Sequence, residues 1–301
     1  MTDTRLVETP ATEPAAPGSL GHLVIRRFLQ HRLAVASLVV FLLLVIGAFV
    51  VPHFWHYAYD HTTTDYSLPP SWQHPFGTDS DGYDQFATVL RGTQRSLEIA
   101  LFVALVATLI GSTYGAVAGF SRGRTDSAMM RVADLILTLP LIAVAALLGY
   151  QVGPRAGGWF FIALVLTALS WPYISRVVRG VVLSLREQEF VEAARALGAS
   201  GRWIIFRHLL PNAVGAIIVT ATIFVATTIL LETALSFIGF GVQPPDTSLG
   251  LLVSRAQTAI DTRPWLFYIP GAFIIAIALT VNFVGDGLRD ALDPTQRRVR
   301  R

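Results

Sequence analysis

The segment between residues 52 and 98 holds the side chains best suited to metal chemistry. It contains four histidines and five aspartates: His53, His56, His61, His74, Asp60, Asp65, Asp79, Asp81 and Asp84. Imidazole and carboxylate groups bind transition metals, but these residues lack the His-x-His or i, i+4 spacing of a recognised site. Aromatic residues among them are typical of a segment beside a membrane span. We therefore expect a folded, wet cap here, with a metal site as the alternative.

The composition excludes several other kinds of chemistry. All 23 cationic side chains are arginines, so the chain has no lysine for a phosphate-binding P-loop or a Schiff base. It has no cysteine, which excludes disulfides and thiolate metal ligands. The sequence also contains no His-Glu-x-x-His motif. We expect no catalytic residue and no cofactor in this chain, and we assign it no metal ligand.

A second set of candidates lies at residues 184–211, between two apolar runs. Ser184 and Glu187 have the spacing of a capping box, which marks the start of a helix. Gly198 supplies a C-terminal stop, so the sequence predicts a helix of about 13 residues between them.

This short helix is expected to be amphipathic. Phe190, Ala194 and Leu197 share one face at i, i+4 and i+7, beside the small Ala193, while Glu192 points elsewhere. An apolar face on such a helix fits a groove on another protein or the surface of the membrane. The residues alone leave both alternatives open.

Long apolar runs must position these segments. Of the 301 residues, 53% are hydrophobic and only 14% are charged, which is too few charges to cover a soluble protein. A bilayer core takes about 20 apolar residues of helix. Six uncharged runs of this kind are 33–51, 99–120, 135–154, 156–175, 209–231 and 264–285. The sequence predicts an all-α membrane protein with six transmembrane helices, the third and fourth joined by a tight turn at 151–158.

The arginines predict the orientation. If the N-terminus is cytoplasmic, 18 of the 23 arginines fall in cytoplasmic segments and 5 in outer ones. Cytoplasmic segments of membrane proteins are enriched in Arg and Lys, so we expect both termini in the cytoplasm. The net charge of +3 then reflects topology, and no nucleic-acid partner is implied.

The chain divides into five expected segments. They are a disordered cytoplasmic tail (1–20), an amphipathic segment with the first transmembrane helix (21–51), an extracytoplasmic segment (52–95), a transmembrane domain (96–290) and a basic cytoplasmic tail (291–301). Residues 21–32 have a helical pattern suited to the cytoplasmic membrane surface, and a simple extension of the first span is the alternative.

Residues 192–211 resemble a known family motif. Glu192-Ala193-Ala194, three residues, Gly198, nine residues and His208-Leu209-Leu210-Pro211 are similar to the EAA loop of ABC importer permeases, with the pattern EAA-x3-G-x9-I-x-LP. His208 stands where that pattern has Ile. The resemblance implies the type I importer permease fold and a set of ATPase-coupling residues: Phe190, Glu192, Ala193, Ala194, Leu197, Gly198 and Pro211.

Further stretches resemble the C-type permease of dipeptide and oligopeptide importers, over about residues 21–297. They are residues 74–79, 179–180, 184–187, 235–245 and 285–294. Tyr83 and Leu249 depart from the family, which often has Arg and Trp there. The resemblance supplies the candidates for contact with a binding protein or for an outer gate: Gly77, Thr78, Asp79, Gln243, Pro244 and Pro245. Asp246, Arg255, Asp261 and Arg263 are further outer charges, available for docking or simply solvated.

The resemblance implies a multi-subunit machine in the bacterial cytoplasmic (inner) membrane. Its expected partners are a homologous B-type permease, one or two cytoplasmic ABC ATPases that use ATP and Mg, an extracytoplasmic substrate-binding protein and membrane lipid. ATP-driven closure of the ATPases would pull the EAA helices together and tilt the attached spans, with Pro211 as a possible joint. The cargo would be dipeptides or oligopeptides, with a nickel or glutathione importer as the alternative.

Two other functions differ in class. An ion-driven secondary transporter would use broken helices and carboxylates at the membrane midplane. The carboxylates nearest the apolar runs, Glu98, Asp134, Glu232 and Asp286, all lie at run ends, where we expect them to be solvated or paired. The sequence contains no catalytic motif that would indicate a membrane-embedded enzyme. Pro140 and Pro172 are expected to bend the third and fourth spans.

Overall fold

The computed structural model describes residues 20–152 and 158–292, and within these ranges the regular structure is helical apart from two isolated β-bridges. Five helices are long and apolar enough to cross a membrane, and a bent pair makes a sixth candidate span. The expected all-α class is therefore confirmed. The predicted tails at 1–20 and 291–301 and the turn at 151–158 lie almost entirely outside the described residues.

The helices differ in length because only some of them span. Their bounds are α1 Leu20–Gln30, α2 Arg32–Val50, α3 Gln85–Ser121, α4 Gly123–Thr138, α5 Leu141–Val152, α6 Trp159–Leu185, α7 Glu189–Ala196, α8 Gly201–Ile204, a π-helical turn Ile205–Leu209, α9 Leu210–Phe237, α10 Leu249–Ala256 and α11 Trp265–Leu292. Short 3-10 turns occupy Val51–His53 and Gln257–Ala259.

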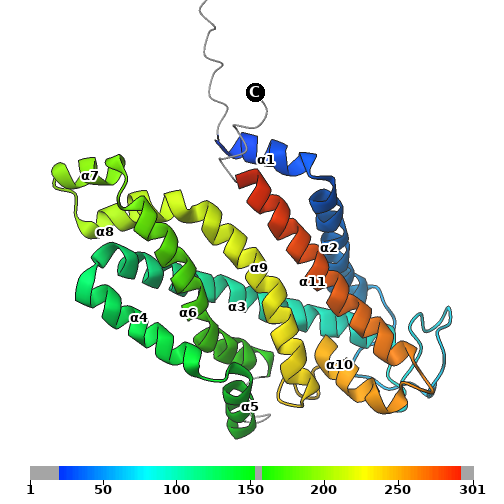
Figure 1. Cartoon of the computed structure of the whole chain (residues 1–301). Helices are drawn as coiled ribbons and strands as arrows, with labels where there is room; N and C mark the ends of the chain where they lie inside the picture. The colour runs from blue at the N-terminus through cyan, green and yellow to red at the C-terminus, as the bar shows by residue number, and fades with distance from the viewer. Residues whose placement is uncertain (1–19, 153–157, 293–301) are drawn as a thin grey trace, which may run out of the picture.

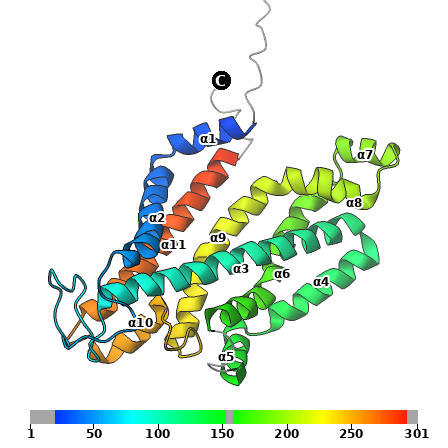
Figure 2. The same ribbon diagram turned by 180° about the vertical axis from the view of Figure 1, so that it is seen from behind.

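The non-spanning elements gather at the two ends of the molecule. At one end lie α1, the C-terminal end of α11 and the α7–α8 pair; at the other lie α10 and the loops after α2 (Figures 1 and 2). The first group is the one that the arginine distribution predicts to be cytoplasmic.

α1 is a separate helix and not an extension of the first span. It lies across the ends of α2 and α11 (Figure 1). The break falls at His31, whose Nδ1 accepts a hydrogen bond from the Ala34 backbone N–H at 3.2 Å and so caps α2. Phe28 and Ala34 are buried in a small cluster with Ala291 of α11. This packing fixes the crosswise position of α1.

α3 begins at Gln85, well before the expected start near residue 99. The early start was hidden because Arg91 and Arg95 interrupt the apolar pattern. In the fold both guanidinium groups bind Asp246, at 2.8 and 2.5 Å, so a charged turn is accommodated within the helix. The outer segment therefore ends at Asp84 instead of residue 95.

The third span, expected at 135–154 with a bend at Pro140, is a bent pair of helices that begins earlier, at Gly123. Gly123–Thr138 and Leu141–Gly149 meet at an angle of 71°. Pro140 follows Leu139, whose backbone is extended (φ −70°, ψ 132°), as the residue before a proline prefers. The predicted bend at Pro140 is thus a break. Pro172, by contrast, lies inside α6, which continues through it.

α3 and α6 form the closest helix pair of the bundle. Gly111, Gly115 and Gly119 recur every fourth residue on the face of α3 that meets α6. A Cβ on Gly111 would lie 2.7 Å from the carbonyl oxygen of Trp171, and one on Gly115 would collide with that of Ser175. Small residues at this spacing let two membrane helices touch along their backbones.

Candidate functional site

The loop between α6 and α9 starts differently from the capping-box prediction. α6 continues to Leu185, and the Ser184 hydroxyl donates back to the carbonyl of Val181 at 2.8 Å. Ser184 is therefore inside a helix and cannot cap the next one. α7 starts at Glu189, after Gln188 in extended conformation, with no side-chain cap. The predicted helix of about 13 residues is thus only 8 residues long.

The predicted stop at Gly198 is confirmed. Gly198 has φ +79°, a left-handed conformation that glycine adopts without steric cost. Its N–H bonds to the carbonyl of Arg195 at 2.9 Å, and the Ala199 N–H bonds to that of Ala194 at 3.0 Å. This pair of bonds is the Schellman motif, and it turns the chain sharply from α7 toward α8.

α7 faces the body of the protein with one side and solvent with the other. Val191 is fully buried and Ala194 is 8% exposed, so both pack inward. Phe190 is 37% exposed, Leu197 88% and Trp203 of α8 49%. These three large apolar side chains therefore remain partly or largely exposed in the described chain.

A groove of about 620 Å³ lies in the angle between α7 and α8. Its lining residues are Phe190, Ala193, Ala194, Leu197, Gly198, Ala199, Ser200, Trp203 and His208. Five of the seven predicted coupling residues are brought together there. Glu192 is exposed outside the lining, and Pro211 lies beyond it at the start of α9.

The joint between the loop and the fifth span is a π-helical turn. It covers Ile205–Leu209, directly before Pro211. Pro211 follows this turn inside one continuous helix, Gly201–Phe237, so its missing N–H removes a backbone hydrogen bond at the junction. π-Helical turns within α-helices are often found at functional sites.

Three contacts tie the loop to the α3–α4 connection. Glu187 forms an ion pair with Arg122, and Arg186 Nη1 donates to the carbonyl of Gly119 at 2.5 Å. The Arg195 guanidinium lies over the Phe120 ring, 5.1 Å from its centroid. The hydrogen bond from Arg122, with a second from Arg186, holds the pKa of Glu187 below its ordinary value.

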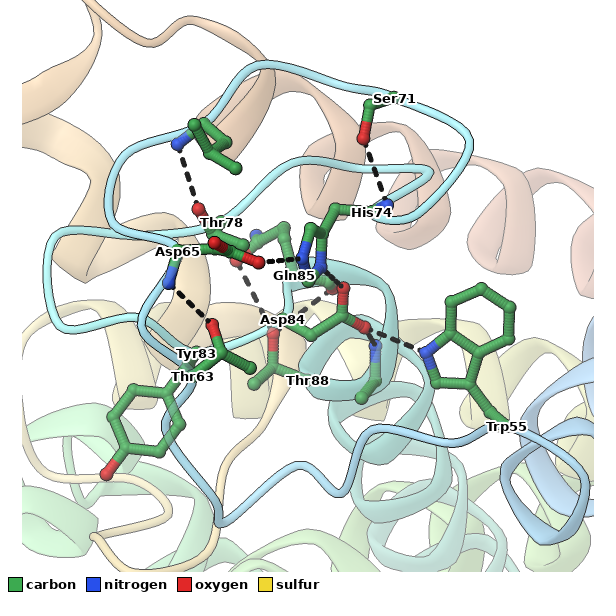
Figure 3. A network of polar contacts seen from close by, with 12 residues as sticks. Trp55, Thr63, Asp65, Ser71, His74, Thr78, Tyr83, Asp84, Gln85 and Thr88 are labelled. Atoms are coloured by element: carbon green, nitrogen blue, oxygen red, sulfur yellow. Dashed lines mark hydrogen bonds and ion pairs between the residues drawn. The ribbon is translucent and has the colours of Figure 1, made fainter.

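The outer segment is built around a buried histidine. Figure 3 shows His74 between two carboxylates: Nδ1 is 2.8 Å from Asp84 Oδ1, and Nε2 is 3.2 Å from Asp65 Oδ2. His74 and Asp84 are both 0% exposed. Asp84 also accepts from Trp55 Nε1 at 3.0 Å and caps α3 through the Ala87 N–H at 2.9 Å. One carboxylate thus joins the outer segment to a transmembrane helix.

Of the four histidines of this segment, only His74 is fully buried. No group of three histidine, cysteine or carboxylate residues with metal-binding geometry occurs in residues 20–152 and 158–292. The expected folded cap is what the structure shows. Tyr57 stacks on the His74 ring, with centroids 4.6 Å apart, which seals the imidazole from solvent.

Of the outer candidates, Gly77 and Thr78 are structural. Gly77 has φ +77°, and a Cβ there would lie 2.6 Å from the carbonyl of Leu68. Thr78 is buried, and its hydroxyl accepts from the Leu68 N–H at 2.8 Å. Gln243 is also held internally, because its amide donates to the Gly239 carbonyl at 2.9 Å.

The other three outer candidates meet at one pocket. Asp79, Pro244 and Pro245 all line a pocket of about 560 Å³ between the outer segment and the chain around α10. Arg255 lines it too. Burial raises the pKa of the Asp79 carboxyl, while backbone N–H bonds from Tyr83 and Asp81 act in the opposite direction.

Two outer charges expected to be free are already paired. Asp246 receives a forked bond from Arg91, 2.8 and 3.3 Å long, and a third bond from Arg95. Arg263 donates to the Ser67 hydroxyl at 2.7 Å. These contacts link the chain after α9 to α3 and to the outer segment, so both charged side chains form hydrogen bonds within the protein.

Of the four carboxylates at run ends, three behave as expected. Glu98 pairs with Arg95, Asp134 pairs with Arg176, and Asp286 is exposed. For Glu232 the expectation is wrong, because this residue is neither solvated nor paired with a cation.

Glu232 is 0% exposed and lies in a cluster of hydroxyl groups. It accepts from Ser96 at 2.9 Å and from Ser236 at 2.6 Å, and the Ser248 hydroxyl lies 3.1 Å from that of Ser236. The cluster joins α3, α9 and the start of α10. Sequence reasoning missed it because, although Ser236 is one helical turn from Glu232, Ser96 comes from a helix distant in the sequence.

The comparisons with known proteins agree with this architecture. Residues 111–298 match the family described as binding-protein-dependent transport system inner membrane component. Residues 19–70 match the N-terminal transmembrane domain of oligopeptide transport permease C. The second match covers α1, α2 and the first part of the outer segment.

Curated relatives cover nearly the whole chain. The oligopeptide transport system permease protein OppC of Mycobacterium tuberculosis (strain H37Rv) is 43% identical over 283 residues, 93% of this chain and 96% of the relative. OppC of Bacillus subtilis is 40% identical over 273 residues, 90% and 88% of the two chains. A putative peptide permease of Brucella suis is 38% identical over 293 residues, 96% of each.

A solved structure shares the fold. A chain of the MetNI methionine ABC transporter in an inward-facing conformation superposes with a TM-score of 0.57 at 20% identity. The similarity covers 68% of this chain and 97% of that one. At this identity it speaks for the fold alone.

Proposed function

This chain belongs to the inner membrane components of binding-protein-dependent transport systems, and from that premise we propose that its α7–α8 groove is the site where an ATPase subunit drives it. The chain is a pore-forming permease subunit of an ABC importer of oligopeptides, and it is a multi-pass membrane protein. Such a permease works with an ATPase and a substrate-binding protein.

One observation carries the coupling proposal. The groove of about 620 Å³ exposes Phe190, Leu197 and Trp203 at the end of the molecule opposite the outer pocket. An exposed apolar patch bounded by polar residues marks an interaction site. The glutamate and alanines of the EAA pattern lie on α7, and Gly198 ends it, so the patch coincides with the motif.

We propose that ATP binding belongs to other subunits, because this chain lacks the residue type that a P-loop needs. ATP and Mg are bound by the partner subunits and not by this chain, which has no lysine for a P-loop. We propose one homologous B-type permease and one or two ATPase subunits as partners. The assembly lies in the bacterial cytoplasmic membrane, with both termini and the α7–α8 groove facing the cytoplasm.

The structure supports a lever mechanism. α7 is a short arm fastened to the α3–α4 connection by Glu187 and Arg195, and it joins α9 through α8 and the π-helical turn. A push on the groove therefore reaches α9 directly. α9 is bonded at its far end to α3 through Glu232 and Ser96, so its movement alters the outer side of the pathway.

The outer pocket suits contact with the binding protein. Asp79, Pro244 and Pro245 form part of its wall. Arg255 also lines the pocket, and its charge is opposite in sign to that of Asp79. A surface with both signs of charge favours a partner with a complementary pattern and sets its orientation on docking.

The coupling proposal can be tested with Gly198→Asp. The variant places a charge at the mouth of the groove and strains the left-handed turn. The chain would be co-produced with its partner permease and ATPases, purified in detergent, and reconstituted with the binding protein. For the wild type we expect peptide uptake, and ATP hydrolysis that a peptide-loaded binding protein stimulates. For the variant we expect both rates to fall at least about tenfold.

Gly239→Asp is a matched control. Gly239 ends α9 at the outer side with φ +86° and the same pair of Schellman bonds, and, as for Gly198, no atom lies within 4 Å of a Cβ built there. It carries the same backbone strain at the opposite end, so the ATPase should remain bound to it. A Gly198→Asp protein that keeps its ATPase and its uptake would overturn the proposal.

A further inference from the structure

His208 is the one polar group in the α7–α8 groove that the described chain leaves unsatisfied. Its Nε2 is buried and has no hydrogen-bond partner. The other polar side chain in the lining, Ser200, already accepts a bond from the Trp203 N–H at 3.4 Å as the cap of α8. The remaining lining residues are apolar or glycine.

Aromatic rings flank the imidazole. The Trp203 ring centroid is 4.6 Å from that of His208, in an edge-on arrangement, and the Phe190 centroid is 6.1 Å away. Both rings are more than a third exposed, so either can shift toward solvent when another molecule enters the groove. The nitrogen is thus enclosed in the isolated chain and within reach of a guest.

A buried nitrogen without a partner destabilises the isolated chain. Native proteins leave few such groups, and each one requires an explanation. The general EAA pattern has Ile at this position, and the apolar surroundings of His208 suit Ile better than imidazole. Residues that cost stability in the free protein are commonly retained for function.

We propose that His208 Nε2 is a recognition point for the ATPase subunit, paired on docking by a side chain that is apolar along its length and carries a neutral hydroxyl at its tip, such as tyrosine. This inference rests on the proposed function of the groove. Phe190, Ala193, Leu197 and Trp203 contact the apolar part of the guest, and His208 in the same lining bonds its tip.

The chemistry of the lining selects a neutral tip over a charged one. Among the described residues that line the groove, His208 is the only acidic or basic one. A charged tip would lose its hydration on entering this apolar lining, which is costly, whereas a neutral hydroxyl needs one hydrogen-bond partner. A phenol loses little on burial if its hydroxyl is bonded, and aromatic residues are frequent anchors at protein interfaces.

The test distinguishes a recognition role of His208 from a packing role, because the proposal predicts that one substitution preserves or raises the Tm and weakens ATPase binding. His208→Ile and His208→Gln would be made in the full permease complex, and ATPase affinity would be measured by titrating purified ATPase onto ATPase-stripped permease in nanodiscs. We expect His208→Ile to leave the Tm of the stripped permease equal or higher and to weaken ATPase binding by about tenfold. His208→Gln, which keeps a side-chain hydrogen-bonding group, should retain more of the affinity.

Either of two results would overturn the inference. Unchanged ATPase affinity for His208→Ile would show that the nitrogen is not used on docking, and a lower Tm would show that the imidazole stabilises the free chain after all. Gly198→Asp, measured alongside, separates the two proposals. If it loses the ATPase while His208→Ile binds normally, the groove is the docking site and only the role of His208 fails.

Discussion

The α7–α8 groove and the outer segment are both connections between spans, yet they satisfy their side chains in opposite ways. In the outer segment, His74 and Asp84 are fully buried and every polar contact of Asp84 is made within the chain. In the groove, Leu197 is 88% exposed, and the His208 nitrogen has no partner. The outer segment satisfies its buried polar groups within the isolated chain, and the groove does not.

The difference indicates what each region is for. A connection that satisfies its own hydrogen bonds is a rigid support, because opening it exposes or strands charged groups. A connection that exposes apolar rings gains stability only when a second protein covers them. Variants of the outer segment should therefore change the stability of the chain, and variants of the groove should change assembly.

The largest effect is expected for Asp84→Ala. The change removes the cap of α3 and the acceptor of the Trp55 N–H, and it leaves His74 buried beside an apolar group. Loss of a helix cap lowers the free energy of unfolding by about 1 kcal/mol. Removal of one partner of a buried pair, which leaves the other partner unsatisfied, lowers it by about 3–5 kcal/mol. We expect a fall in Tm of the detergent-purified permease and new proteolysis between residues 55 and 84, with ATPase capture unchanged below the transition.

Asp65→Asn is the matched control for this variant. Asp65 contacts the other nitrogen of the same imidazole at 3.2 Å, but its side chain is 43% exposed. Water can replace a solvent-exposed partner, so the loss should be below about 1 kcal/mol. Equal destabilisation by the two variants would contradict the view that Asp84 is the central group.

An intermediate effect is expected for Asp246→Asn, which weakens the link between α3 and the chain after α9. The carboxylate accepts three bonds from Arg91 and Arg95, and all three side chains are less than a quarter exposed. Loss of charge-assisted bonds here should cost about 1–3 kcal/mol, measured by denaturant unfolding. Asp261→Asn, at an exposed outer carboxylate, should change nothing.

Most of the fold could be predicted because it follows from local patterns. Apolar runs mark the spans, the φ-positive Gly198 marks the end of α7, and the position of Pro140 marks a bend. The misses come from contacts between distant residues. The start of α3 was misplaced because Arg91 is neutralised by Asp246 from another part of the chain.

The candidate sites show the same limit. Five of the seven coupling candidates, without Glu192 and Pro211, gathered at one groove because they are close in sequence. The outer candidates separated into a buried turn at Thr78 and a pocket wall at Asp79. The Ser184 capping box failed because α6 simply continues through it. The buried state of Glu232 could not be found, because Ser236 is one turn along the same helix but Ser96 comes from α3, which only the fold brings to it.

The smallest effect is expected for Glu187→Gln, which tests how firmly the incomplete region is attached. Glu187 is solvent-exposed, and its pairing with Arg122 and Arg186 lowers the pKa of the carboxyl from the ordinary 4.5. A lowered folded-state pKa means that the ion pair contributes stability above pH 4.5 and that this contribution disappears as the pH falls through the lowered value. At pH 7 the variant should melt about 1 °C below the wild type, and the two should converge in acid.

Arg122→Gln supplies the second arm of the comparison. If the ion pair is the link between the α7–α8 loop and the α3–α4 connection, each single variant should lower Tm alike, and the double variant should be no worse than either. Protease cleavage within residues 186–200 should rise in all three, because the arm then keeps only the Arg186 bond to Gly119, Arg195 over Phe120 and the burial of Val191 among the contacts described. Additive losses would instead mean that the two charges act independently and that the arm owes its position to packing alone.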